Sequence, residues 1–130
     1  MKILVITEND NCCGPMAVRF LNDFNDSVEA FSAGISPDAN VEQNVVKLMH
    51  ECFCDLSEYK PVQFRPSMLG DADCVVIIGE TSFDVSPSKA IRLEVPPLLL
   101  ESDTLEEMRV LRDYIKNESF VIFKGLVGKN

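Results

Sequence analysis

The sequence has 130 residues, of which 46% are hydrophobic and 25% charged, and this predicts one domain spanning residues 1–130. Twelve Lys and Arg against 21 Asp and Glu give a net charge of -9, which argues against nucleic-acid partners and anionic membrane surfaces. The apolar runs fall far short of the roughly 20 residues that span a bilayer, and the start does not resemble a secretory signal, so we expect a cytoplasmic protein. An odd number of cysteines, five, favours free thiols over a disulfide framework.

The first third of the chain alternates between strand and helix patterns. Residues 3–6 form a continuous apolar run that a polar loop, 7–14, ends, which is typical of a strand buried in a parallel sheet. Pro15 is a favoured first helical residue. The apolar residues behind it recur at helical spacing and predict a helix that faces the sheet: Met16, Ala17, Phe20, Leu21 and Phe24. Residues 27–33 predict a short second strand.

The middle of the chain continues this alternation. Residues 41–52 carry the most regular amphipathic helix pattern, and residues 67–72 indicate a short helix. Two apolar runs, 74–78 and 90–95, predict further parallel strands. These runs bring the number of predicted strands to four.

The last helix begins at a capping box formed by Thr104 and Glu107. Residues 120–123 either extend this helix or form a terminal strand, because periodicity does not assign so short an apolar run. Strands that alternate with helices predict an α/β fold: a three-layer α/β/α arrangement around a four-stranded parallel sheet. Ligand sites of such folds lie beyond the carboxyl ends of the strands, so the loop after the first strand is the candidate ligand-binding loop. Its residues are Thr7, Glu8, Asn9, Asp10, Asn11, Cys12, Cys13 and Gly14.

The order of these motifs resembles the low-molecular-weight protein tyrosine phosphatase and arsenate reductase family. The resemblance begins with strand 3–6, its polar loop and Pro15-Met16-Ala17, and continues with Phe31-Ser32-Ala33-Gly34. Weaker matches follow in the same order at 55–57, 60–61 and 71–73. It implies the low-molecular-weight phosphatase-like fold. It also implies a first loop with a nucleophilic Cys, an Arg and backbone amides that hold the anion, and a helix whose N-terminus lowers the Cys pKa.

The residues that carry catalysis in the family are replaced at the matching positions. Thr7 stands at the position of the nucleophilic Cys, and a Thr hydroxyl stays protonated near neutral pH. Cys13 stands at the position of the phosphate-binding Arg, whose bidentate grip a thiol lacks. Pro96-Pro97 occupies the place of the general-acid Asp. Gly79 stands where the reductases have a second Cys, and the nearest thiol there is Cys74.

The loop carries two acidic residues, Glu8 and Asp10, which would repel a phosphate. The amides at a helix start need acceptors, and we hypothesise that one of these carboxylates fills the former anion site and stabilises the helix start. A cation site built from Thr7, Glu8 and Asp10 is a weaker alternative, because a helix N-terminus disfavours positive charge.

Other residues of interest have simpler interpretations. Cys13 and Arg19 have the spacing of cysteine phosphatases, but Arg19 fits better as a solvated charge on the first helix. The adjacent Cys12 and Cys13 are interpreted as a small buried residue next to a thiol at the start of a helix. A redox or metal-binding role of the pair is the alternative. His50 fits a surface or half-buried position of the second helix better than a catalytic role, and Cys52 fits a core position of the same helix. We predict no metal site and no cofactor.

The preferred functional interpretation is a phosphatase-like protein that has lost catalysis and serves a binding or regulatory role, with a protein or small-molecule partner. The alternative is an active cysteine-dependent phosphatase or arsenate reductase that uses Cys12 or Cys13. The two interpretations differ in whether either thiol lies in an anion-binding loop.

Overall fold

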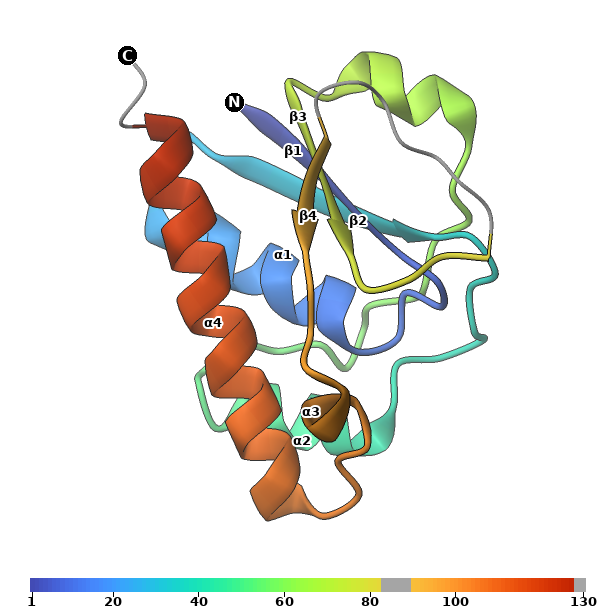
Figure 1. Ribbon diagram of the computed structural model, residues 1–130, viewed down its shortest axis with the longest axis vertical. Helices are drawn as coiled ribbons and strands as arrows, with labels where there is room; N and C mark the ends of the chain where they lie inside the picture. Colours follow the sequence, from blue (N-terminus) through green and yellow to red (C-terminus); the bar gives the residue numbers. More distant parts are fainter. Residues whose placement is uncertain (83–89, 128–130) are drawn as a thin grey trace.

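The computed structural model describes residues 1–82 and 90–127, and a four-stranded parallel sheet forms its centre (Figure 1). Strands β1 (Lys2–Thr7), β2 (Glu29–Gly34), β3 (Cys74–Ile78) and β4 (Ala90–Leu93) lie in the order β2-β1-β3-β4. The predicted α/β fold with four parallel strands is therefore confirmed. The chain leaves β1 on one side to form β2 and crosses to the other side to form β3. The loops after β1 and β3 thus diverge at one edge, where α/β folds bind ligands.

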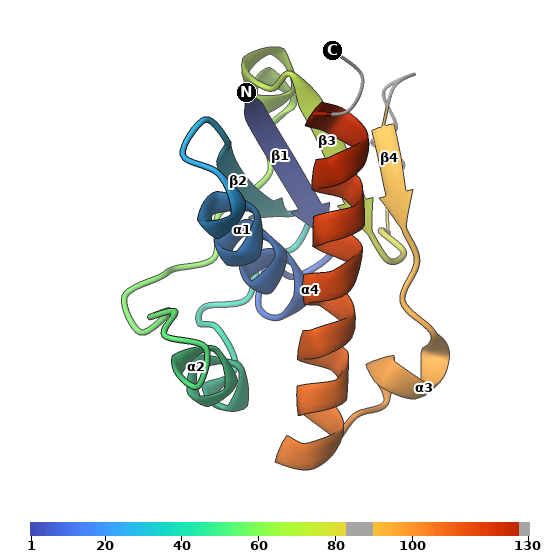
Figure 2. The same cartoon turned by 90° about the vertical axis from the view of Figure 1, so that its left-hand side faces the viewer.

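The helices are α1 (Cys13–Phe24), α2 (Gln43–His50), α3 (Pro97–Leu100) and α4 (Leu105–Val127), with a 3₁₀ helix, η1 (Pro66–Asp71). Helices α1 and α4 lie on the same side of the sheet (Figure 2). Alternate residues of a strand face opposite sides, and Ile3 and Val5 of β1 join the core made by these helices, while Leu4 and Ile6 pack with Met68 and other residues on the other side. The second outer layer is thus η1 and the loop before it.

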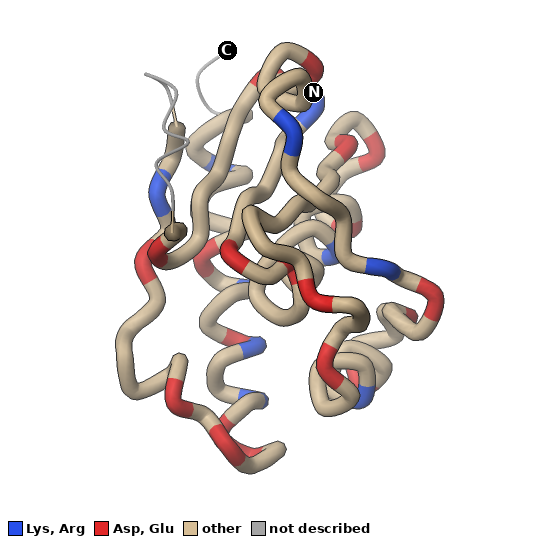
Figure 3. Tube along the Cα trace, turned by 90° about the vertical axis from the view of Figure 1, so that its right-hand side faces the viewer, with Lys and Arg blue, Asp and Glu red and all other residues tan. Residues whose placement is uncertain are grey.

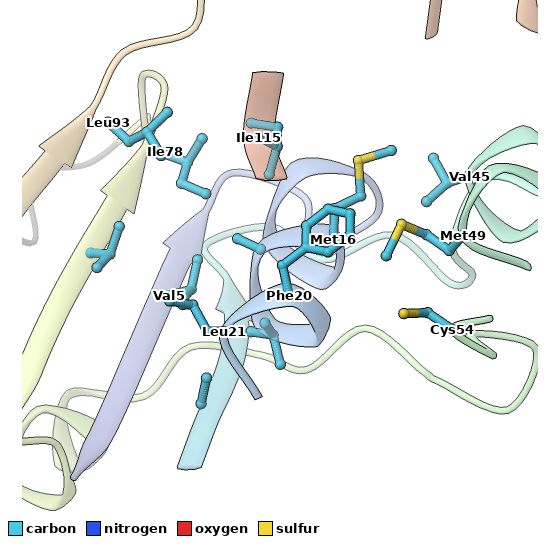
Figure 4. Close-up of a cluster of buried hydrophobic side chains, with 14 of the residues drawn as sticks. Val5, Met16, Phe20, Leu21, Val45, Met49, Cys54, Ile78, Leu93 and Ile115 are labelled. Atoms are coloured by element: carbon cyan, nitrogen blue, oxygen red, sulfur yellow. The ribbon is translucent and has the colours of Figure 1, made fainter. Parts of the chain in front are cut away.

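The larger core lies between the sheet, α1, α2 and α4, and Figure 4 shows its centre. Met16 and Phe20 of α1 point into the space between the sheet and α2, and Met49 of α2 points toward Met16. Ile115 of α4 is fully buried, with 0% of its surface exposed. A fully buried Leu, Ile or Met stabilises a fold by about 2–5 kcal/mol relative to Ala, so this packing holds α1 and the loop before it in place.

Several boundaries differ from the sequence predictions. Helix α1 begins at Cys13, so Pro15 is its third residue and not its first, which the first turn tolerates because its N–H groups lack intrahelical partners. Residues 120–123 belong to α4, which settles the open assignment. Strand β4 ends at Leu93, and α3 was not predicted, since four residues are too few to show a period.

The capping box is confirmed, because the Glu107 amide donates to the Thr104 hydroxyl at 3.2 Å and the Thr104 amide donates to the Glu107 carboxylate at 3.2 Å. All five cysteines are free thiols, as predicted. Within residues 1–82 and 90–127, no helix combines the length and the apolar character that crossing a membrane requires.

Candidate functional site

A cleft of about 1130 Å³ opens at the carboxyl ends of β1, β3 and β4. One wall consists of the loop after β1, and the structure places six of its eight predicted residues on the cleft surface: Thr7, Glu8, Asn9, Asn11, Cys12 and Cys13. The other wall runs from Ile78 at the end of β3 to the segment around α3. The remaining two loop residues, Asp10 and Gly14, are buried behind this surface.

The backbone of the loop directs its carbonyl groups away from the cleft. The carbonyl oxygens of Thr7, Glu8, Asn9 and Asn11 accept hydrogen bonds from amides of residues 35–42, at 3.1, 2.7, 3.0 and 3.2 Å. Within the loop itself, the Asp10 amide donates to the Thr7 hydroxyl oxygen at 3.0 Å. The amides of Cys12, Cys13 and Gly14 have no acceptor among the described residues. The loop therefore joins the start of α1 to the segment after β2.

Thr7 ends β1 at the position predicted to match the nucleophile of the related enzymes. The side chain is nearly buried, with 8% of the residue exposed, and its hydroxyl oxygen accepts a hydrogen bond from the Asp10 amide at 3.0 Å. The described residues provide no hydrogen-bonded base for this hydroxyl. Thr7 thus helps to shape the loop through this hydrogen bond.

Asp10 is the most deeply buried charged residue of the site, with 0% exposure. Its Oδ2 accepts hydrogen bonds from the Tyr59 hydroxyl at 2.5 Å and from the Val62 amide at 2.8 Å. The Tyr59 hydroxyl in turn lies 2.7 Å from the hydroxyl of Ser32 on β2. Asp10 also has a positive φ of 51°, a conformation that Asp adopts more readily than most residues. The loop is therefore joined to β2 and to the segment before η1.

The hypothesis that a carboxylate occupies the former anion site is wrong for both acidic residues. Asp10 bonds Tyr59 and Val62 and not the amides of α1, whose N-cap residue, Cys12, makes no side-chain cap. Its Oδ1 is buried without a hydrogen-bond partner. Burial raises the pKa of this carboxyl, although the Tyr59 and Val62 hydrogen bonds act in the opposite direction. Asp10 thus ties the loop to Tyr59 and Val62 on the side away from the cleft, although burial disfavours its charged form.

Glu8 lies on the cleft side of the loop and connects it to the loop after β3. Its carboxylate accepts from the Ser82 amide at 2.6 Å and from the Ser82 hydroxyl at 2.9 Å. These bonds, with the backbone one first, lower the pKa of Glu8. Since Glu8 and Asp10 bond different segments, they do not converge on one point. No group of three His, Cys, Asp or Glu residues within 1–82 and 90–127 has the arrangement of a metal site.

Gly34 explains how closely β2 approaches the loop. A Cβ atom at this position would lie 3.0 Å from the carbonyl carbon of Asn9 and 3.0 Å from the amide nitrogen and Cβ of Asp10. These distances are shorter than most real Cβ contacts, so a side chain at this position would require the loop backbone to shift. The close approach lets the Ile35 and Ser36 amides reach the loop carbonyls.

Cys12 and Cys13 are partly exposed, and both line the cleft. The two thiols interact: the hydrogen bond from Cys12 lowers the pKa of Cys13, whereas the same contact and burial raise the pKa of Cys12. Glu42, on the same cleft wall, raises both pKa values through its charge. The pKa values of the two thiols are therefore shifted in opposite directions.

The charged residues of the cleft are mostly acidic, and Figure 3 shows acidic positions along the loops of the molecule. Besides Glu8, the carboxylate-bearing residues that line it are Glu42, Glu80 and Glu94, together with the basic Arg92. Pro97, from the pair predicted to replace the general acid, lines the cleft, and no Asp does so among the described residues.

The other candidates lie away from the cleft lining. Arg19 is close enough to Cys54 and Asp55 to affect their pKa values, as expected for a helix charge rather than a partner of Cys13. His50 is exposed at the end of α2, as predicted. Cys52 is only partly buried against the core.

Sequence reasoning missed the residues that hold Asp10. Tyr59 and Val62 lie 49 and 52 positions away from it, in a segment whose mixed polarity shows no period. The available signal was Asp10 itself, an acidic residue close to the end of a buried strand. A buried carboxylate needs hydrogen-bond donors, but the sequence does not show which residues supply them.

A scan against protein-family models gives no match to this sequence, and a search of curated proteins gives none either. Solved structures do match. A thioredoxin-dependent arsenate reductase from Corynebacterium glutamicum has a TM-score of 0.79 at 20% identity, over 99% of this chain and 63% of that chain. This protein thus spans less than two thirds of that reductase.

Two phosphatases match over nearly their whole length. An arginine phosphatase from Geobacillus stearothermophilus has a TM-score of 0.75 at 18% identity, over 98% of this chain and 94% of its own. A tyrosine phosphatase from Escherichia coli K30, solved with sulphate, has a TM-score of 0.75 at 16% identity, over 96% and 97%. This chain has the fold of the low-molecular-weight phosphatases and arsenate reductases.

Proposed function

We propose that this protein is a low-molecular-weight phosphatase-like protein without phosphatase catalysis, which binds a ligand in the cleft beside residues 7–14. The observation that carries the proposal is Thr7: the side chain at the end of β1 is a hydroxyl fixed by the Asp10 amide, at the position where the resemblance expects a thiolate. Catalysis by a protein fold resides in its site, and a shared fold does not supply it.

Two further features of the cleft support the loss of phosphoryl transfer. Cys13 replaces the Arg that would bind the phosphate in a bidentate manner, and Pro96-Pro97 replaces the general acid. Cys12 and Cys13 nevertheless line a cleft of about 1130 Å³, and their amides have no acceptor among the described residues. The site has therefore lost the reactive side chains and kept a concave, polar binding surface.

A second candidate function is an active thiol enzyme that uses Cys13. The observation in its favour is the position of Cys13, which is the first residue of α1 and lines the cleft; the hydrogen bond from Cys12 also lowers the pKa of its thiol. A phosphatase of this kind forms a phosphocysteine from a phosphate ester, and a reductase reduces arsenate with thiols.

A turnover assay separates the two functions. The wild-type protein is incubated with 4-nitrophenyl phosphate, with a phosphoarginine peptide, and with arsenate plus a thioredoxin system, beside the Cys13→Ser variant. We expect no turnover above that of the variant for any of the three. Turnover that Cys13→Ser abolishes and the matched Cys74→Ser retains would overturn the proposal in favour of the thiol enzyme.

A further inference from the structure

Two adjacent thiols face the same cleft, and the proposed loss of phosphatase catalysis leaves them without a role. Cys12 is the N-cap residue of α1 and Cys13 is the first helical residue. Both are partly exposed and line the cleft. Cys54, by contrast, is 3% exposed and donates to the Asp23 carboxylate at 3.3 Å, and Cys52 and Cys74 pack against the core.

We propose that Cys12 and Cys13 form a dithiol site for monosubstituted trivalent arsenicals, which bridge the two sulfurs inside the cleft. The proposal names a class of ligand for the cleft beside residues 7–14. It rests on the proposed function in one respect, because it takes this cleft to be a ligand-binding site.

The covalent geometry favours a bridging atom over a direct bond between the sulfurs. Consecutive Cα atoms are about 3.8 Å apart, whereas disulfides usually join Cα atoms about 4.4–6.8 Å apart, so a disulfide between neighbours is strained. An arsenic atom between the sulfurs enlarges the ring and relieves this strain. Trivalent arsenic is pyramidal and binds two sulfurs at a small angle, which suits side chains that start from adjacent residues.

The number of ligands also selects trivalent arsenic over a structural metal. Zinc sites in proteins use four protein ligands, or three with an open position. Within the described residues no third Cys, His, Asp or Glu joins the thiols in such an arrangement. A monosubstituted trivalent arsenical needs only two sulfurs, because its third bond goes to its own organic group.

The surroundings of the thiols suit a neutral ligand with an apolar substituent. Glu42 places negative charge near both sulfurs, which disfavours a dianion such as arsenate and leaves an uncharged arsenous species unaffected. The opposite wall supplies apolar side chains, among them Leu99, Leu100 and Met108, against which the substituent can pack.

The binding step balances without any change of oxidation state. With phenylarsonous acid, C₆H₅As(OH)₂, the Cys13 thiolate attacks arsenic and the first hydroxide leaves. Cys12 then forms the second arsenic–sulfur bond and displaces the second hydroxide. Two arsenic–sulfur bonds replace two arsenic–oxygen bonds, the two thiol protons leave with the hydroxides as two waters, and arsenic stays trivalent. The unequal pKa values of the two thiols fit this order of attack.

The test uses phenylarsine oxide, which hydrates to phenylarsonous acid, and intact-protein mass spectrometry of the full chain. We expect one adduct on the wild-type protein at equimolar probe, reversed by 2,3-dimercaptopropanol and not by the same thiol concentration of glutathione. Cys12→Ser and Cys13→Ser should each weaken binding by more than about tenfold, since the second sulfur binds intramolecularly at high effective concentration. The matched variants Cys52→Ser and Cys74→Ser should bind as the wild type does.

The proposal is overturned if the adduct survives in either Cys12→Ser or Cys13→Ser, or if Cys52→Ser removes it, because the pair Cys52 and Cys54 would then be the site. Thermal unfolding checks that the serine variants fold, and Cys12→Ala and Cys13→Ala replace them if they do not. Turnover of phosphate esters would contradict the proposed function and leave this adduct unchanged, so the two failures are distinguishable.

Discussion

Two carboxylates of this protein, Asp10 and Glu51, are held in opposite ways. Asp10 is fully buried behind the loop after β1, and its hydrogen-bond donors are a phenol and an amide, which are both neutral. Glu51 follows α2 on the surface, with 40% of its side chain exposed, and pairs with Arg109 at 2.8 Å and Arg112 at 2.7 Å.

The difference teaches which environment can position a functional loop. Burial raises the pKa of Asp10, whereas the Arg109 and Arg112 guanidinium groups lower the pKa of Glu51 to about 2. Neutral donors in a buried site lose little to salt and hold a fixed geometry. Exposed ion pairs contribute little to stability, since water and salt screen them. The loop is therefore shaped by the costly buried carboxylate, and the surface pair only ties α4 to the end of α2.

The largest effect on stability should come from adding a side chain at Gly34, where β2 contacts the loop that contains Asp10. Gly34→Ala places a Cβ 3.0 Å from backbone atoms of the loop, and we expect a loss of about 3 kcal/mol in the free energy of unfolding. Urea denaturation measures it. Gly70→Ala is the matched control, because no atom lies within 4 Å of its Cβ position, and it should change stability little. Equal effects of the two substitutions would contradict the close approach.

Removing the Tyr59 hydroxyl, which donates to Asp10, should have the next largest effect on stability. Tyr59→Phe leaves the buried carboxylate with the Val62 amide as its one remaining donor, and we expect a cost of about 2 kcal/mol at pH 7 by urea denaturation. The matched control is Tyr114→Phe, since the Tyr114 hydroxyl donates to the Glu94 carbonyl oxygen at an exposed site. If Tyr114→Phe costs as much, the Asp10 contact has no special weight.

Asp10→Asn should change the pH dependence of stability more than its magnitude. The pKa of Asp10 is raised in the folded state above its ordinary value of 3.8, so the folded state binds this proton more tightly. Its contribution to stability is fully present below pH 3.8 and is lost as the pH rises through the folded pKa. Asn keeps an acceptor for Tyr59 without the charge.

We therefore expect Asp10→Asn to be more stable than the wild type at pH 7, by about 1 kcal/mol, with the difference shrinking toward pH 4. Thermal unfolding from pH 4 to pH 8 measures it, and Asp26→Asn, at an exposed position, corrects for the general loss of one charge. A difference that does not depend on pH would mean that burial does not raise this pKa.

The smallest effect should come from Glu51→Gln. The pKa of Glu51 is lowered to about 2, so its contribution is present above its ordinary value of 4.5 and is lost as the pH falls from there toward 2. We expect a small decrease in the melting temperature at pH 7 that disappears in 1 M NaCl, with the exposed Glu58→Gln as the control. A large, salt-independent decrease would show that the surface pair matters as much as the buried site.

The sequence by itself determined the α/β fold and the position of the loop. Four short apolar runs, their helical neighbours and the capping box at Thr104 and Glu107 express local periodicity, which a single sequence displays directly. The proposed replacement of the nucleophile by Thr7 also rests on the sequence alone, because it concerns residue identity at the end of a strand.

Only the tertiary structure decided how the loop is held. Tyr59 and Val62, which donate to Asp10, lie about 50 residues away from it, and Tyr59 in turn contacts Ser32 of β2; no local period encodes contacts over such separations. The hypothesis of a self-filled anion site failed for this reason: sequence reasoning considered only the nearest donors, the amides of α1. The positions of Glu42, Leu99 and Met108 on the cleft wall were likewise set by the packing of α2, α3 and α4. The end of a strand depends mainly on the residues of the strand itself. The hydrogen-bond donors to a buried carboxylate depend on which distant segments lie beside it in the folded chain.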